Sequence, residues 1–98
     1  MGYRPMRIEA APRFNRIAKN LEPAVKQALD REILRLADNP YKGDRKKGAL
    51  RDVLVEKFEA ANDQWLLAYR VLEKEQVLQL LHFGQHENFY RDLTKYLK

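Results

Sequence analysis

The sequence contains no cysteine and only four glycines. The lack of cysteine excludes disulfides, thiolate zinc sites and cysteine nucleophiles, and it fits a reducing compartment, so we expect a cytoplasmic protein. No stretch approaches the roughly 20 apolar residues of a membrane span, and no membrane partner is therefore expected. The few glycines form neither a phosphate loop nor a dinucleotide fingerprint, so we also expect no cofactor.

Length and charge narrow the possible functions further. With 98 residues the chain can build one small core but not two, and residues 1–98 are interpreted as a single domain. It carries 19 Lys and Arg residues against 14 Asp and Glu residues, which gives a net charge of +5. This surplus favours a polyanionic partner, and RNA is the first candidate.

The first half of the chain has a helical hydrophobic period. After a short strand at residues 4–10, a helix is expected from Pro12 to about Asn20. A second helix begins at Pro23 and is stopped by Asn39-Pro40. Two consecutive helices of this kind form a hairpin with one apolar face.

The second half of the chain changes to a strand-like period. Residues 41–51 are polar and contain two glycines, which predicts a loop. Strands are expected at 52–59, 65–72 and 76–83, and the last two are apolar at nearly every position, which is typical of central strands covered on both faces. Gly84 is expected to break the last strand, and residues 88–97 are expected to form a short helix.

These patterns predict an α+β fold. An N-terminal strand and a helical hairpin pack on a mainly antiparallel sheet of about four strands, and a short helix closes the chain.

Both histidines of the chain, His82 and His86, fall close together near its C-terminal end. Histidine can give and take protons near neutral pH. Beside Tyr90 and Arg91, in a basic protein, this pair predicts acid-base chemistry on an anionic substrate. A metal site is not expected, because the glycine between the two histidines interrupts helical spacing and no cysteine or third histidine completes a ligand set.

Several segments together resemble the RelE/ParE superfamily of bacterial toxins. They are Asn39-Pro40, then Lys-Lys-Gly-Ala-Leu-Arg at 46–51, Trp-Leu-Leu-Ala-Tyr-Arg at 65–70, and Gly-Gln-His-Glu-Asn-Phe-Tyr-Arg-Asp-Leu at 84–93. The resemblance covers nearly the whole chain and implies the toxin of a type II toxin-antitoxin module. It is nearer to the RelE/YafQ-like mRNA interferases, which implies a ribosome-dependent endoribonuclease.

The same resemblance implies roles for individual residues. His86 falls on a catalytic histidine of the YafQ-like branch, Tyr90 takes the position of a functional phenylalanine, and His82 takes that of an arginine. Leu66 occupies a position where RelE itself has a catalytic arginine. Cutting RNA through its own 2′-hydroxyl needs a base, an acid and cations but no metal, and His86 is suited to either proton transfer. Tyr90 is suited to stacking on a base or orienting the phosphate.

The remaining candidates are cations for phosphate binding and one aromatic side chain. Trp65 is a possible base-stacking platform, although a position that opens a central strand also fits a core residue. The pool of candidate phosphate-binding residues consists of Lys46, Lys47, Arg51, Lys57, Arg70 and Arg91.

Two other functions remain open. Leu81-His82-Phe83-Gly84 resembles the end of the last strand in ParE-like toxins, which would imply a DNA gyrase inhibitor without nuclease activity and a structural His82. Because Leu66 replaces an arginine, a non-toxic remnant that only binds antitoxin is the third reading. The resemblance implies an acidic antitoxin as partner in each case, with mRNA and the ribosome, or alternatively gyrase, as target.

Overall fold

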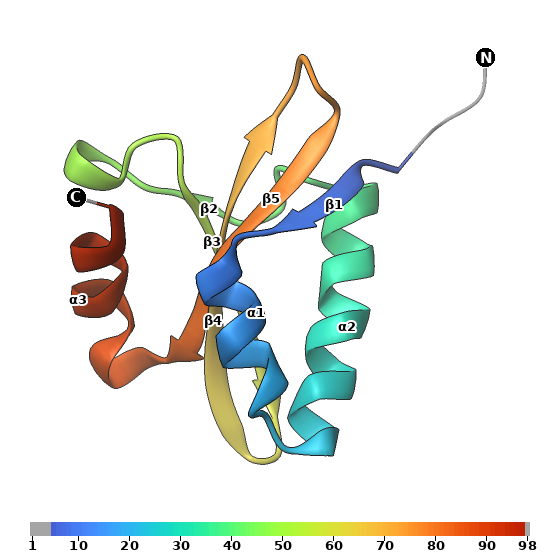
Figure 1. Ribbon diagram of the computed structural model, residues 1–98, viewed down its shortest axis with the longest axis vertical. Helices are drawn as coiled ribbons and strands as arrows, with labels where there is room; N and C mark the ends of the chain where they lie inside the picture. Colours follow the sequence, from blue (N-terminus) through green and yellow to red (C-terminus); the bar gives the residue numbers. More distant parts are fainter. Residues whose placement is uncertain (1–4, 98) are drawn as a thin grey trace.

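The computed structural model describes residues 5–97 and has the predicted α+β architecture. Its elements in chain order (Figure 1) are β1 (Arg7–Ala10), α1 (Pro12–Lys19), α2 (Pro23–Asp38), β2 (Asp44–Arg45), the 3-10 turn η1 (Gly48–Leu50), β3 (Leu54–Ala60), β4 (Asp63–Leu72), β5 (Val77–Gln85) and α3 (His86–Leu97). Both prolines that open helices lie in the first turn, where the missing N–H costs no hydrogen bond. Residue 4, where the first strand was expected to begin, lies outside the described residues. No helix within residues 5–97 is long and apolar enough to cross a membrane.

The sheet has five strands in the order β1-β5-β4-β3-β2. β1 pairs with β5 in parallel, whereas the other pairs are antiparallel. The extra strand comes from the segment predicted to be a loop, because Asp44 and Arg45 pair with Val55 and Leu54 at the edge of the sheet. A two-residue edge strand that faces water has no apolar pattern, which is why the sequence did not indicate it.

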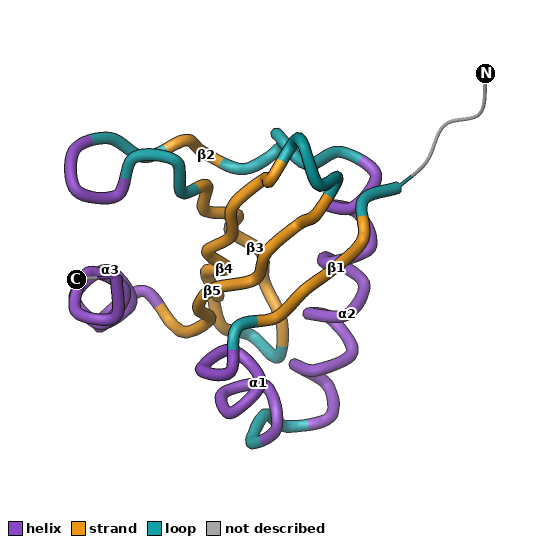
Figure 2. The backbone as a smooth tube through the Cα atoms, turned by 45° about the horizontal axis from the view of Figure 1, so that its top comes forward, coloured by secondary structure: helices purple, strands orange, loops and turns teal. Residues whose placement is uncertain are grey.

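The two faces of the sheet are covered by different helices. Figure 2 shows α1 and α2 on one face and α3 on the other. β4 and β5 lie inside the sheet and contribute to both cores, as their apolar sequences predicted. The core on the α3 side is built from Val53, Val55, Leu66, Ala68, Leu81, Phe89 and Leu93.

A β-bulge in β5 determines which face His82 occupies. Ala68 pairs with His82 and Tyr69 pairs with Leu80, so Leu81 is left without a partner across the strand pair. One extra residue lets two successive side chains lie on the same face. Leu81 belongs to the α3-side core, and the ring of His82 lies 5.2 Å from that of Phe89 in α3.

The predicted break at Gly84 is wrong. Gly84 pairs with Leu66 inside the sheet, β5 continues to Gln85, and α3 begins at His86 rather than at residue 88. A glycine in a strand needs no turn where a neighbouring element covers it, and Phe89 of α3 lies over this position. His82 therefore lies within β5, whereas His86 is the first residue of α3.

A charged cluster fixes the segment that leads from α2 to β2. The Nζ of Lys42 contacts Glu32 Oε2 at 2.8 Å and also donates to Glu56, and both carboxylates are buried. Burial raises the pKa of the Glu56 carboxyl, and Glu32 adds to this rise while Lys42 opposes it. Burial acts on Glu32 in the same direction, but hydrogen bonds with Glu56, Lys42 and Arg35 outweigh it and lower the pKa of Glu32.

Tyr69 holds the same segment from the sheet. Its hydroxyl donates to the Pro40 carbonyl at 2.8 Å and accepts from the Gly43 N–H at 2.9 Å. A Cβ at Gly43 would lie 2.7 Å from this hydroxyl, so only glycine fits there. Burial raises the pKa of Tyr69 to about 12, and the hydroxyl therefore stays protonated and keeps both bonds.

We predict that Lys42→Met destabilises the protein in a pH-dependent way. Removing the cation leaves two buried carboxylates, and the expected loss is about 3 kcal/mol at pH 7, at the low end for a broken buried ion pair because the Lys42 side chain is 40% exposed. Without Lys42 the rise that burial and Glu32 cause in the pKa of the Glu56 carboxyl is no longer opposed, so its folded pKa lies further above the unfolded one and the loss shrinks as the pH falls toward about 4.5. Urea unfolding at pH 7 and pH 5 measures this, with the exposed Lys74→Met as control. An equal loss at both pH values would contradict the account of the cluster.

Candidate functional site

The exposed N-terminal end of α3 carries a titratable side chain, His86, that is accessible to a substrate. His86 is the first residue of the helix and is exposed, whereas Phe89 and Leu93 on the other side of α3 are buried. Four residues later, Tyr90 lies one turn further along the same face. The rings of His86 and Tyr90 meet edge to face with centroids 5.9 Å apart.

Lys46 reaches this pair from the loop after β2. Its Nζ lies 5.2 Å from the centre of the Tyr90 ring, within the range of a cation-π contact. The backbone N–H of Lys46 donates to the Val53 carbonyl at 2.9 Å, and Leu50 of η1 packs against the α3-side core. We call His86, Tyr90 and Lys46 the α3 cluster.

His82 lies beneath the α3 cluster, and Phe89 separates the two. It is only 4% exposed, and its Nδ1 accepts a hydrogen bond from Nε of Arg13 at 3.3 Å. Burial lowers the pKa of His82, nearby Arg13 lowers it further, and Asp92 opposes them. His82 is therefore a neutral imidazole with its proton on Nε2.

Arg13 joins three elements at this point, and the sequence pattern did not single it out. Besides its bond to His82 in β5, its guanidinium lies 5.3 Å from the centre of the Tyr96 ring in α3. Since Arg13 precedes His82 by 69 positions in the chain, no local signal in the sequence could have paired them.

Lys57 is an exposed cation on β3. Lys57 pairs with Leu66, which pairs in turn with Gly84, so Lys57 lies in the same row as Gly84. A Cβ at Gly84 would meet only Phe89, at 4.0 Å, among the described residues. Leu66 in the middle of this row is fully buried, so the row offers the exposed Lys57 as a cation but no continuous accessible surface.

Three other predicted cations, Lys47, Arg51 and Arg91, are neighbours in sequence of the residues that form the cluster or its loop. Lys47 and Arg51 are exposed on the loop that carries Lys46. Arg91 is exposed on α3, next to Tyr90 in sequence, and its Nε lies 3.7 Å from a carboxylate oxygen of Asp92.

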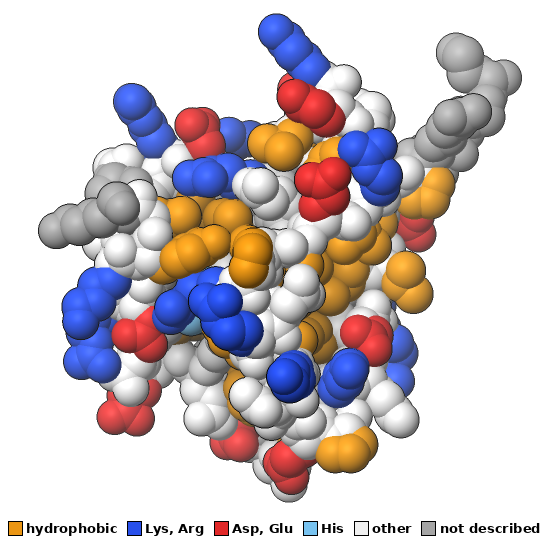
Figure 3. Space-filling view, in the orientation of Figure 1, with side chains coloured by type: hydrophobic (Ala, Val, Ile, Leu, Met, Phe, Trp, Pro, Cys, Tyr) orange, Lys and Arg blue, Asp and Glu red, His pale blue; other side chains and the backbone are white. Residues whose placement is uncertain are grey.

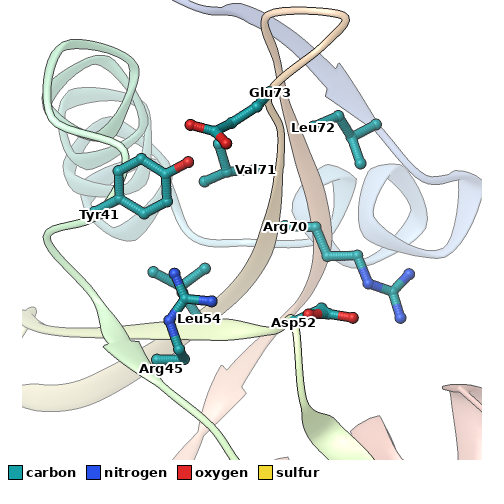
Figure 4. A pocket seen from close by; sticks show the side chains of 8 residues that line it. All are labelled: Tyr41, Arg45, Asp52, Leu54, Arg70, Val71, Leu72 and Glu73. Atoms are coloured by element: carbon teal, nitrogen blue, oxygen red, sulfur yellow. The ribbon is translucent and has the colours of Figure 1, made fainter.

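Arg70 belongs to a different part of the surface. It pairs with Gln79, five strand residues or about 16 Å from the Trp65 position that pairs with Gln85 at the end of β5. There it lines an open pocket of about 380 Å³ together with Tyr41, Arg45, Asp52, Leu54, Val71, Leu72 and Glu73. Figure 4 shows Arg45 pointing toward Tyr41 and Arg70 pointing away from them.

Trp65 lies on the opposite face of the sheet from the α3 cluster. Its ring stacks on Phe83 with centroids 5.0 Å apart, and its Nε1 donates to the Ala60 carbonyl at 3.2 Å. The side chain packs against the core under α1 and α2. The structure thus brings together His86, Tyr90 and Lys46, with Lys57 nearby, and separates them from Arg70 and Trp65.

The α3 cluster combines the groups that phosphate chemistry in water requires. An exposed imidazole can exchange protons, an ammonium group can stabilise negative charge, and an aromatic ring offers a surface for stacking.

Known proteins similar to this chain share its fold. A family model described as "ParE-like toxin of type II bacterial toxin-antitoxin system" matches residues 8–94. No curated protein matches the sequence. Among solved structures, a double-arginine mutant of the E. coli toxin RelE in the free state is similar at a TM-score of 0.78 and 15% identity, over 96% of this chain and 95% of that one.

Two toxin-antitoxin complexes contain similar chains. The E. coli RelBE complex gives a TM-score of 0.71 at 17% identity, over 84% of this chain and 98% of that chain. RelBE2 from Mycobacterium tuberculosis gives 0.71 at 17% identity, over 84% and 99%. At these identities the likeness shows the fold, and it confirms the fold that the sequence predicted.

We predict that Arg13→Gln raises the pKa of His82 toward its ordinary value of 6.5, because the neighbouring charge is lost while burial remains. Since the folded pKa lies below the unfolded one, the stability that His82 contributes is present above pH 6.5 and is lost as the pH falls below it. In the variant this acid-induced loss is smaller. NMR titration of the His82 ring measures the shift, with Arg16→Gln on the solvent side of α1 as control. Identical titration curves for Arg13→Gln and the wild type would refute the contact.

Proposed function

This chain belongs to the ParE-like toxins of type II bacterial toxin-antitoxin systems, and on that premise we propose that it is an endoribonuclease that cuts mRNA on the ribosome. The observation that carries the proposal is the α3 cluster, in which an exposed histidine and a tyrosine of α3 meet a lysine from the distant loop after β2.

The proposed reaction is attack by the 2′-hydroxyl of RNA on the adjacent phosphorus. The 2′-hydroxyl loses its proton to a base, the bond from phosphorus to the 5′-oxygen breaks, and that oxygen receives a proton from an acid. The products are a 2′,3′-cyclic phosphate and a 5′-hydroxyl. The nucleophile belongs to the substrate, so side chains suffice and no metal takes part in the proposal.

His86 carries one of the two proton transfers in this scheme. Its ring is held edge to face against Tyr90, and the Nζ of Lys46 lies 5.2 Å from the centre of the same tyrosine ring, where it can contact a phosphate of the bound strand. Tyr90 orients the phosphate or stacks on a base. Lys57 and the exposed Lys47, Arg51 and Arg91 supply further phosphate contacts.

We assign His82 a positioning role. A side chain that is 4% exposed does not reach a polymer at the surface, but its ring supports Phe89, the neighbour of Tyr90. General acid-base assistance contributes about 10² to 10⁴ in rate, so one exposed histidine with a few cations makes a modest nuclease. Dependence on the ribosome to position the mRNA fits this modest chemistry.

The proposed partner that controls the toxin is an acidic antitoxin. The net charge of +5 favours an acidic segment, and the RelBE complexes are toxin-antitoxin complexes of similarly folded chains. Binding of this kind combines charge neutralisation with folding of a disordered segment on the toxin surface.

Two observations favour a second candidate function, inhibition of DNA gyrase. Leu66 stands where the RelE resemblance implies a catalytic arginine, and it is fully buried in the α3-side core. The buried His82, hydrogen-bonded to Arg13, also fits a structural histidine as in the ParE-like reading. A remnant that only binds antitoxin would share both features.

We predict that His86→Ala lowers mRNA cleavage on programmed ribosomes by about 100-fold or more, because a proton transfer is lost. Primer extension maps the cuts, and the same mRNA free in solution tests ribosome dependence. Asn88→Ala is the matched control, since Asn88 is exposed two positions further along α3.

Cleavage by His86→Ala at the wild-type rate would show that His86 is not in the site. If neither protein cuts, supercoiling by purified gyrase decides between the alternatives. Inhibition would favour the ParE-like function, and its absence would favour the antitoxin-binding remnant.

A further inference from the structure

The exposed side of α1 carries cations and no carboxylates. Arg13, Arg16 and Lys19 follow one another at three-residue spacing, and Phe14 lies buried on the other side of the helix. At 1.5 Å per residue these three positions span about 9 Å along the helix. Within residues 5–97 none of them forms an ion pair.

The neighbouring helix shows that this arrangement is particular to α1. The cations of α2 alternate with carboxylates in its sequence, and Arg35 is paired with Glu32 at 3.1 Å. Cations near a helix C-terminus are favoured by the helix dipole, which accounts for Arg16 and Lys19 alone. Arg13 lies in the first turn, where the dipole disfavours a cation.

The cations of α1 adjoin α3, the helix that carries the candidate site. Arg13 contacts both His82 in β5 and Tyr96 in α3, and His82 leads through Phe89 to Tyr90. Figure 3, in the orientation of Figure 1, shows Lys and Arg side chains gathered over α1. An RNA strand that extends from the α3 cluster along α3 toward Tyr96 therefore meets the positive charge of α1.

We propose that Arg16 and Lys19 form a second phosphate-binding surface, which holds RNA backbone outside the nucleotides that are cut. This inference rests on the proposed function for the identity of the ligand. Unpaired cations at regular spacing gain free energy by displacing counterions from a polyphosphate, without reading its sequence. RNA is favoured over an acidic protein because the row of cations adjoins α3, which carries the α3 cluster.

The test measures RNA binding without cleavage. The substitutions Arg16→Gln and Lys19→Gln are introduced together into full-length protein that already carries His86→Ala. The affinities of this protein and of the His86→Ala parent for a fluorescent single-stranded RNA are measured by anisotropy over a range of salt concentrations. Each phosphate contact contributes about 0.7 to the slope of log affinity against log salt concentration. At about 0.1 M salt one such contact therefore raises the affinity by a factor of about 5. The double variant should bind about 25-fold more weakly, with a slope smaller by about 1.4.

The matched control is Lys26→Gln with Arg31→Gln, which removes the same charge from exposed positions of α2. A second arm measures co-sedimentation of both variants with ribosomes. A specific loss on free RNA assigns the surface to the mRNA strand, and a loss on ribosomes alone assigns it to ribosomal RNA.

Equal weakening by both pairs of substitutions, or no weakening by the α1 pair on either free RNA or ribosomes, would overturn the inference. A loss of antitoxin binding without any loss of RNA binding would overturn it in favour of an acidic protein partner. If the wild type fails to cut mRNA but the α1 pair still weakens RNA binding, the proposed nuclease fails and this surface stands.

Discussion

The burial of Phe89 and Leu93 against the sheet is the interaction on which the candidate site depends. α3 has 12 residues, and an isolated helix of that length is marginal in water. Both side chains are essentially inaccessible to solvent, and each contributes about 1.5–3 kcal/mol of hydrophobic free energy. This packing holds Tyr90 where Lys46 can reach it and keeps His86 at the exposed start of the helix.

Charge is distributed to serve two different purposes in this small protein. The buried Glu32 and Glu56 pair with the partly exposed Lys42, and this cluster fixes the chain between α2 and β2. The surface cations around α3 and along α1 are mostly unpaired and are available to a polyanion. Arg13 belongs to both groups, because it is one of the cations of α1 and also has structural contacts. It donates a hydrogen bond to a buried histidine and covers an aromatic ring of α3.

The sequence predicted the helices, the long strands and the covering of β4 and β5 on both faces, because these follow from hydrophobic period and from proline positions. It failed at Gly84, which stays in the strand because Phe89 packs over it, and at β2, whose two polar residues carry no pattern. The sequence also indicated only that His82 lies near a turn, and not that it is buried against α3. The β-bulge and the contact with Arg13 that determine its position depend on the folded structure. Glu32 falls in register with the apolar stripe of α2, and that signal could have revealed the buried cluster.

The central claim is that the α3 cluster acts on RNA whose own 2′-hydroxyl is the nucleophile. The most direct measurement is cleavage on ribosomes of an mRNA with a single 2′-deoxy nucleotide at the cut position, compared with the all-ribose mRNA. The account predicts that cleavage at this position is abolished while the toxin still binds the ribosome. Cleavage of the 2′-deoxy mRNA at the same position and rate would contradict it.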